Sequence, residues 1–292
     1  TDNGKQINMN IAPNPSHLET VGAVVEGITR AKLENKFDGN TNKVLPIIVH
    51  GDAAIAGQGL SYEIVQMAGL KGYGTGGTVH IVVNNQIGFT TNYLDARTST
   101  YCTDVAKVTL SPVIHVNSDD AEAVVHATLF ALDYRMRFKG DVFIDLLGYR
   151  KYGHNEGDEP RFTQPQLYKA IAKHQNPRDI YADGLKAAGF IDNEYVKLLE
   201  KEYKDSLEHD LMDSRKIETT VITPFMADEW KTFVRVDEVE MAKRVVTDVS
   251  KKKLDTVAET ITTLPSEHSF LRKIERLIAD RKAMYFEKDQ LD

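Results

Sequence analysis

Four short apolar runs constrain the fold of this chain more than any other feature. They are Val44–Val49, Thr78–Val83, Val113–Val116 and Val142–Leu147. Continuous apolar runs of this length are typical of strands that are buried on both faces of a parallel sheet. Residues with helical spacing fill His17–Leu33, Leu60–Leu70 and Asp119–Lys139. This alternation predicts an α/β fold, with a mainly parallel sheet covered by helices on both faces.

The end of the chain has a different character. After Leu207 the sequence becomes highly charged, and two or three amphipathic helical patterns follow before the C-terminus. We therefore predict one domain over residues 1–215 and a helical extension or linker over residues 216–292. The chain also opens without an initiator methionine or a leader-like segment, so we expect it to be part of a longer protein.

Composition narrows the classes of partner. The formal net charge of -7 argues against a nucleic acid or an anionic membrane surface as the main partner. No apolar run approaches the roughly 20 residues that span a bilayer. The single cysteine, Cys102, excludes an internal disulfide and is typical of a protein from a reducing compartment rather than a secreted one.

Polar residues follow the first two apolar runs at the point where each strand should end. His50-Gly51-Asp52-Ala53 follows the first run, and Asn84-Asn85-Gln86-Ile87 follows the second. Right-handed crossovers bring the carboxyl ends of parallel strands to one edge of a sheet, where ligands bind. A carboxylate and an amide at that edge could share an oxygen-ligated divalent cation such as Mg²⁺. The alternative, that Asp52 simply caps the next helix, stays open.

Three histidines lie in segments that we expect to meet at this edge of the sheet. They are His17, His50 and His154. Imidazole titrates near neutral pH, so these residues could transfer protons or bind a carboxylate, although a surface or hydrogen-bonding role is the ordinary alternative. Ser16 and Glu19 form a capping-box pattern at the start of the first helix. The stretch Gly88–Pro112 shows no periodicity and predicts a long irregular loop.

These motifs resemble a known enzyme family. The GDA turn and the NNQIGFTT run look like the diphosphate-binding motif of thiamine diphosphate enzymes. Around them, NPSHLE, HGDAAIAGQG, YCTDVAK and YGHNEGDEPRFTQP resemble the decarboxylating component of 2-oxoglutarate dehydrogenase. The resemblance runs over about Asn14 to Leu185. One departure from the wider superfamily is Ala53, where many members carry glycine, and alanine is small enough for the same close approach.

The resemblance implies cofactors and residue roles. Thiamine diphosphate and Mg²⁺ are the implied cofactors, and the metal ligands are the Asp52 carboxylate, the Asn85 side chain and the Ile87 carbonyl. Ala53 would pack close to the diphosphate, and His50 is a weaker candidate for the same cofactor pocket. The loop 89–107 would order over the cofactor.

The resemblance also implies a reaction. His17 and His154 would face 2-oxoglutarate during its oxidative decarboxylation, in which the thiazolium ring of the cofactor acts as electron sink. The succinyl group would pass to a lipoyl group carried by dihydrolipoamide succinyltransferase, within a multienzyme complex. The parent enzyme would be a homodimer, in the cytoplasm of a bacterium or the mitochondrial matrix of a eukaryote.

Several alternatives remain open at this point. A related substrate such as 2-oxoadipate, and a non-catalytic assembly domain, both fit the same residues. A Rossmann-like oxidoreductase would need G-x-G-x-x-G after a strand, and Gly57-Gln58-Gly59 supplies only part of it. The family's second, pyrimidine-binding domain has no counterpart in the sequence, so we expect no turnover by this chain alone.

Overall fold

The computed structural model describes residues 4–14, 16–219 and 226–288. The chain divides into two compact units, Thr1–Phe225 and Met226–Asp292, and each is described by itself. The sequence places its domain boundary after residue 215, and the assignment of those two segments as domains stays a prediction.

The first unit is built on a four-stranded sheet. Its strands stand in the order β1-β2-β6-β5, and every neighbouring pair is parallel. Their bounds are β1 Ile47–Gly51, β2 Val79–Asn84, β5 Val113–Asn117 and β6 Val142–Leu147. Each predicted apolar run therefore forms a strand, shifted by at most a few residues. The fold class predicted from the sequence is confirmed.

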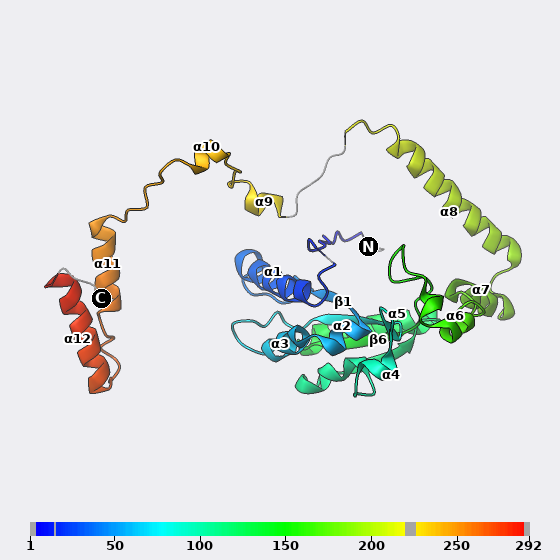
Figure 1. Cartoon of the computed structure of the whole chain (residues 1–292), viewed down its shortest axis with the longest axis horizontal. Helices are drawn as coiled ribbons and strands as arrows, with labels where there is room; N and C mark the ends of the chain where they lie inside the picture. The colour runs from blue at the N-terminus through cyan, green and yellow to red at the C-terminus, as the bar shows by residue number, and fades with distance from the viewer. Residues whose placement is uncertain (1–3, 15, 220–225, 289–292) are drawn as a thin grey trace. The chain divides into compact units, whose positions relative to one another are not determined.

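Helices cover both faces of this sheet (Figure 1). One face packs against α2 (Asp52–Gly57), α3 (Gly59–Met67) and the 3₁₀ helix η1 (Cys102–Thr109), and α1 (Thr20–Phe37) packs beside α3. The other face packs against α5 (Ala121–Phe138). Successive side chains of a strand point to opposite faces, so Val82 enters the first core cluster and Val79 the second.

The stretch predicted to be a long irregular loop is largely ordered, so that prediction is wrong. It forms a two-stranded hairpin of β3 (Ile87–Gly88) and β4 (Thr91–Asn92), then α4 (Tyr93–Ala96) and η1. Cys102 and Val105 of η1 lie in the core cluster with Phe143 of β6. These elements are too short to show periodicity, and they are stabilised by packing: the hairpin and α4 lie against α2, and η1 lies against α2, α3 and β6.

The capping box predicted at the start of α1 is also absent. The helix begins at Thr20, and Glu19 stands at the N-cap position with a φ of 67° and no side-chain capping bond. The Glu19 side chain is instead buried and accepts hydrogen bonds from Ser61 and His50. A partner distant in sequence has replaced the local one.

After β6, the regular elements of the described residues are all helices. The first unit continues through η2 (Pro160–Phe162), α6 (Pro165–Ile171), α7 (Pro177–Ala187) and α8 (Asn193–Ser214). The second unit contains α9 (Ala227–Trp230), α10 (Glu238–Met241), α11 (Lys251–Ile261) and α12 (Arg272–Phe286), where the Tyr285 hydroxyl donates to Asp255 at 3.0 Å. Among the residues that the structure describes, no helix has the length and apolar character of a membrane span.

Candidate functional site

The carboxyl ends of the four strands meet at one edge, and Asp52 lies there as the first residue of α2. Its side chain is almost fully buried, with 2% of the residue exposed. The nearest charge is that of Arg97, whose Nη1 lies 3.5 Å from Asp52 Oδ2. Burial raises the pKa of the Asp52 carboxyl, and the positive charge of Arg97 offsets part of that rise. The site therefore contains a buried carboxyl group that lies 3.5 Å from its cationic partner, farther than an ordinary hydrogen bond.

The β3–β4 hairpin packs directly against the start of α2. A Cβ added at Gly88 would lie 2.6 Å from the Cβ of Ala53, so only glycine allows this approach. The Asn85 side-chain oxygen accepts a hydrogen bond from the Ile87 amide at 3.3 Å, which fixes the turn between β2 and the hairpin. The Asp52–Ala53 turn thus packs against the hairpin that contains Ile87, and Asn85 lies in the turn between β2 and that hairpin.

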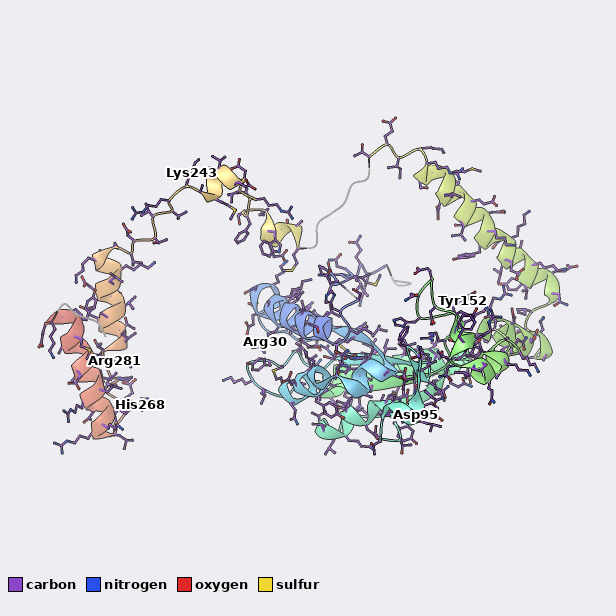
Figure 2. The ribbon with its side chains drawn as sticks, in the orientation of Figure 1. Arg30, Asp95, Tyr152, Lys243, His268 and Arg281 are labelled. Atoms are coloured by element: carbon purple, nitrogen blue, oxygen red, sulfur yellow. The ribbon has the colours of Figure 1, made fainter. Side chains whose placement is uncertain are left out.

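The loop after β6 is joined to the same hairpin by three hydrogen bonds. Arg150 Nη2 donates to the Phe89 carbonyl at 2.9 Å, and Gln164 Nε2 donates to the carbonyl of Thr90, also at 2.9 Å. In the opposite direction, Gln86 Nε2 donates to the Gly148 carbonyl at 2.8 Å. These bonds make the hairpin and the loop one structural unit, in which Tyr152 marks the loop in Figure 2.

His154 lies on that loop, beside the hairpin. Its ring meets the ring of Phe89 edge-on, with 4.8 Å between the ring centres. Its backbone amide donates to Asp158 at 2.8 Å, and its side chain is exposed. His154 is therefore placed close to the predicted metal residues and is open to solvent.

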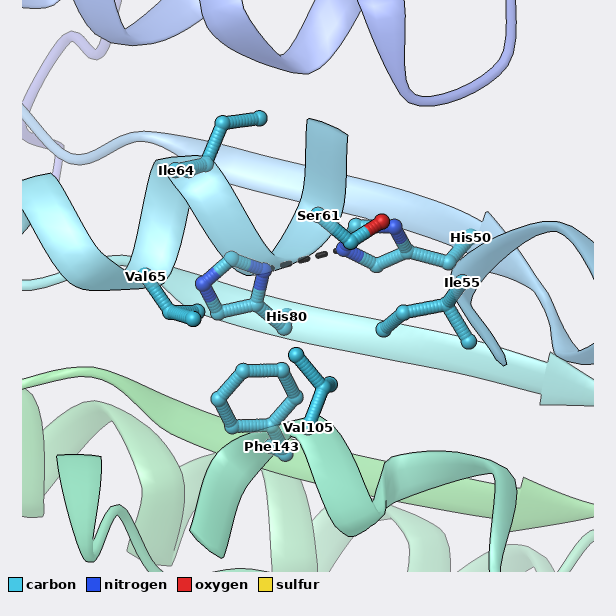
Figure 3. A pocket seen from close by; sticks show the side chains of 8 residues that line it. All are labelled: His50, Ile55, Ser61, Ile64, Val65, His80, Val105 and Phe143. Carbon is cyan, nitrogen blue, oxygen red and sulfur yellow. Dashed lines mark hydrogen bonds between the residues drawn. The ribbon is translucent and has the colours of Figure 1, made fainter. Parts of the chain in front are cut away.

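His17 and His50 occupy different environments. His17 is exposed in the turn that precedes α1, two residues before the buried Glu19. His50 is buried, and both of its ring nitrogens have protein partners: Nδ1 lies 2.8 Å from Glu19 Oε2, and Nε2 lies 2.9 Å from His80 Nδ1. Figure 3 shows this contact between the two rings. The role of His50 in cofactor binding stays a prediction, and both nitrogens of its imidazole are already within hydrogen-bond distance of protein groups.

The cavity beside this histidine pair is too small for a substrate. It is lined by His50, Ile55, Ser61, Ile64, Val65, His80, Val105 and Phe143 (Figure 3). Its volume, about 10 Å³, is roughly that of one water-sized sphere. This interior space therefore has no room for a substrate or a cofactor.

The buried carboxylate of Asp145, which the sequence did not predict, binds side chains near the carboxyl ends of the strands. Asp145 of β6 accepts hydrogen bonds from Asn84 Nδ2 at 3.0 Å and from His115 Nδ1 at 2.7 Å. The Cys102 thiol approaches the same carboxylate at 3.8 Å. Asn84 is thereby occupied in the interior, whereas its neighbour Asn85 remains at the edge.

The groups where the Asp52 turn meets the hairpin are suited to a hard cation. The Asp52 carboxylate, the Asn85 amide oxygen and the Ile87 carbonyl are all oxygen donors, which Mg²⁺ prefers. Among the described residues, no group of three or more His, Cys, Asp or Glu side chains could hold a metal ion. A metal at this corner would therefore take one carboxylate from the chain and complete its shell with amide, carbonyl, water and phosphate oxygens.

Comparison with known proteins identifies the family. The family model described as "Dehydrogenase E1 component" matches residues 3–221. The chain is 41% identical over 292 residues to the 2-oxoglutarate dehydrogenase E1 component of Haemophilus influenzae, covering 99% of this chain and 30% of that protein. It is 43% identical over 289 residues to the component of the same name from Azotobacter vinelandii, covering 96% and 30%.

A eukaryotic relative gives the same result. The mitochondrial 2-oxoglutarate dehydrogenase of Dictyostelium discoideum is 40% identical over 285 residues, which cover 98% of this chain and 28% of that protein. The chain thus spans less than a third of the length of these relatives. The match to the family model covers most of the chain and includes the whole sheet and its polar edge, and this chain belongs to the dehydrogenase E1 component family.

Proposed function

We propose that this chain supplies the metal- and diphosphate-binding part of an enzyme that oxidatively decarboxylates 2-oxoglutarate. The observation that carries the proposal is the identity of 39–43% with 2-oxoglutarate dehydrogenase E1 components over nearly the whole chain. The reaction would transfer the succinyl group to a lipoyl carrier on dihydrolipoamide succinyltransferase.

The proposed cofactors are thiamine diphosphate and Mg²⁺. The buried Asp52 carboxylate, the Asn85 amide oxygen and the Ile87 carbonyl would hold the metal, and the close Ala53–Gly88 contact would form the floor of the diphosphate site. When bound, the cofactor would supply an electron sink for the loss of carbon dioxide. The contribution of this chain is to fix the oxygen ligands on short elements that pack against each other.

His17 and His154 are proposed to face the substrate. Both imidazoles are exposed and therefore accessible to a ligand, and His154 lies beside the hairpin at the open edge. A neutral imidazole can donate a hydrogen bond to a substrate carboxylate, and it can hold a proton near neutral pH. The ring contact with Phe89 gives His154 a defined position beside the hairpin.

The proposal extends to the assembly of the whole enzyme. We propose that the whole enzyme acts as a homodimer within a multienzyme complex with the succinyltransferase. Its location would be the cytoplasm in a bacterium or the mitochondrial matrix in a eukaryote, since the relatives are bacterial or mitochondrial.

The test is calorimetric titration of the chain with thiamine diphosphate, with and without Mg²⁺. We expect binding that requires Mg²⁺, and we expect Asp52→Asn to abolish it, because the amide removes the only carboxylate of the proposed metal site. The matched control is Asp104→Asn, an acid on η1 whose side chain is paired with Lys107. Unchanged affinity in Asp52→Asn, or equal loss in both variants, would refute the metal assignment.

A further inference from the structure

Arg97 is the most deeply buried cation near the proposed cofactor site. It follows α4 directly, and its side chain is 7% exposed. Two of its nitrogens, Nε and Nη1, are buried and have no hydrogen-bond partner among the residues that the structure describes. Within the described ranges, its ionic contact is the 3.5 Å approach of Nη1 to Asp52 Oδ2. Arg97 therefore carries donors that the described protein does not satisfy.

Such an arrangement is unfavourable in the protein alone. Buried polar groups are almost always hydrogen-bonded, and a donor left without an acceptor costs about 1–3 kcal/mol, more for a charged group. The guanidinium lies 5.5 Å from the Tyr93 ring centre, and this contact orients it without supplying an acceptor oxygen. An unpartnered buried guanidinium beside a ligand site indicates a ligand that brings the acceptors.

The chemistry of the neighbouring groups identifies the class of that ligand. Guanidinium groups bind phosphate oxygens strongly, since the interaction is charge-assisted and directional. A metal held by Asp52 would carry phosphate oxygens to within a few ångströms of that carboxylate, and Arg97 contacts the same carboxylate. We propose that Arg97 binds the diphosphate group of the metal-bound cofactor. This inference rests on the proposed function and adds a binding residue to it.

The local fold explains how Arg97 is delivered to this position. The Asn92 side chain caps α4 by accepting from the Leu94 amide, and the Tyr93 amide donates to the Gln86 carbonyl at 3.3 Å. The segment 85–97 therefore carries Asn85 in the turn before the hairpin, Ile87 on the hairpin and Arg97 at its end. One continuous segment supplies both the metal oxygens and the anion-binding guanidinium.

The affinity of Arg97→Met for Mn²⁺ alone distinguishes anion binding by Arg97 from a role in positioning Asp52. If Arg97 binds the anion, Arg97→Met should weaken binding of Mn²⁺ with inorganic pyrophosphate by about 10- to 100-fold, the range for charge-assisted hydrogen bonds. The same variant should bind Mn²⁺ alone at least as tightly as the wild type, because a positive charge beside Asp52 has been removed. A residue that only positions Asp52 would weaken both.

The experiment measures protein-bound Mn²⁺ and protein-bound pyrophosphate separately by equilibrium dialysis, with each ligand alone and with both together, because pyrophosphate also chelates Mn²⁺ in free solution. Arg97→Lys keeps the charge and should lose less affinity for the anion than Arg97→Met. Arg161→Met is the control, because Arg161 is exposed and paired with Glu159. Circular dichroism of each variant reports whether the fold is kept.

Each outcome decides the matter. Loss of pyrophosphate binding without loss of Mn²⁺ binding supports the proposal. Parallel loss of both, no change in either, or a wild-type chain that binds no pyrophosphate overturns it. Asp52→Asn is measured beside these variants: if it loses Mn²⁺ while Arg97→Met changes nothing, the metal site stands and only the role of Arg97 falls. If Asp52→Asn also changes nothing, the proposed function fails with it.

Discussion

The close contact between Gly88 and Ala53 gives a sharp prediction about what holds the site together. The variant Gly88→Ala would place a methyl group 2.6 Å from the Ala53 Cβ, whereas ordinary contact begins at 3.4 Å. Both atoms are attached directly to backbone, so no side-chain rotation relieves the clash. The hairpin and α2 must move apart by most of an ångström.

The size of the effect follows from overpacking. Forcing a methyl group into a tightly packed contact costs about 1–3 kcal/mol of the free energy of unfolding. The double variant Ala53→Gly with Gly88→Ala moves the methyl group from one partner to the other and removes the clash. It should recover most of the loss, leaving about 0.5–1 kcal/mol for a glycine in α2. The rescue separates the steric clash from any general effect of a new alanine.

The assay can be restricted to the first unit. The only tryptophan, Trp230, lies in the second unit, so its fluorescence would report the wrong part of the chain. The only cysteine, Cys102, is buried in the core cluster of the first unit together with Ile55 of α2. Its alkylation across a urea series therefore reports unfolding of the first unit. Gly57→Ala on α2 is the matched control, because a Cβ there would meet no atom within 4 Å.

The result that would refute the reasoning is equally clear. One such result is that Gly88→Ala unfolds at the same urea concentration as Gly57→Ala, and another is that the double variant is no more stable than Gly88→Ala alone. Either finding would mean that the hairpin does not pack on α2 as described.

Two further predictions concern buried titratable groups. Burial alone raises the pKa of Glu19, but the hydrogen bond and charge of His50 and the Ser61 bond outweigh it and hold that pKa below 4.5. The carboxylate therefore stabilises the fold above about pH 4.5, and this contribution is lost as the pH falls through the lower folded-state value. Glu19→Ala should cost about 3–5 kcal/mol at pH 7 and less in acid, measured by urea denaturation at several pH values; a difference independent of pH would contradict this. Burial, with the nearby Asp145 charge, raises the pKa of Cys102 to about 12, so Ellman's reagent at pH 8 should react only after urea is added. Rapid reaction of the folded chain would show that the thiol is accessible.

The main elements were predictable because their signals are local. Each strand is a run of apolar residues, and α5 shows helical spacing, so periodicity identifies them and the parallel sheet follows. The same logic gathers the turns of Asp52 and Asn85 at one edge, because the carboxyl ends of parallel strands joined by right-handed crossovers meet there. The structure agrees on the edge and on this pair of turns.

The residues that were missed depend on partners far away in the chain. Glu19 looks like a capping residue, yet it accepts from His50 and Ser61, which no local pattern reveals. Arg97 lies in a stretch without periodicity, where an arginine is ordinarily a solvated surface residue. Its burial depends on four-residue α4 and on the hairpin before it, both of which are stable only through tertiary contacts. Patterns in sequence predict which faces are buried, but not which charges will share a buried space.

The Asp52–Arg97 contact shows why metal and phosphate should bind together. In the protein alone, each charge has the other as its nearest opposite charge among the ion pairs of the described residues, at 3.5 Å and with two guanidinium nitrogens unbonded. When a metal and a diphosphate bind together, the metal would contact Asp52 and the phosphate oxygens would contact Arg97, and these contacts would replace the long one between the two side chains. A metal arriving alone satisfies Asp52 but adds positive charge beside Arg97, and an anion arriving alone satisfies Arg97 but adds negative charge beside Asp52. Each is opposed by the charge that the other would neutralise. The Asp52–Arg97 site is therefore complementary to the metal and the diphosphate together and to neither ion alone. For this reason, loss of Arg97 should weaken the binding of pyrophosphate without weakening the binding of Mn²⁺ alone.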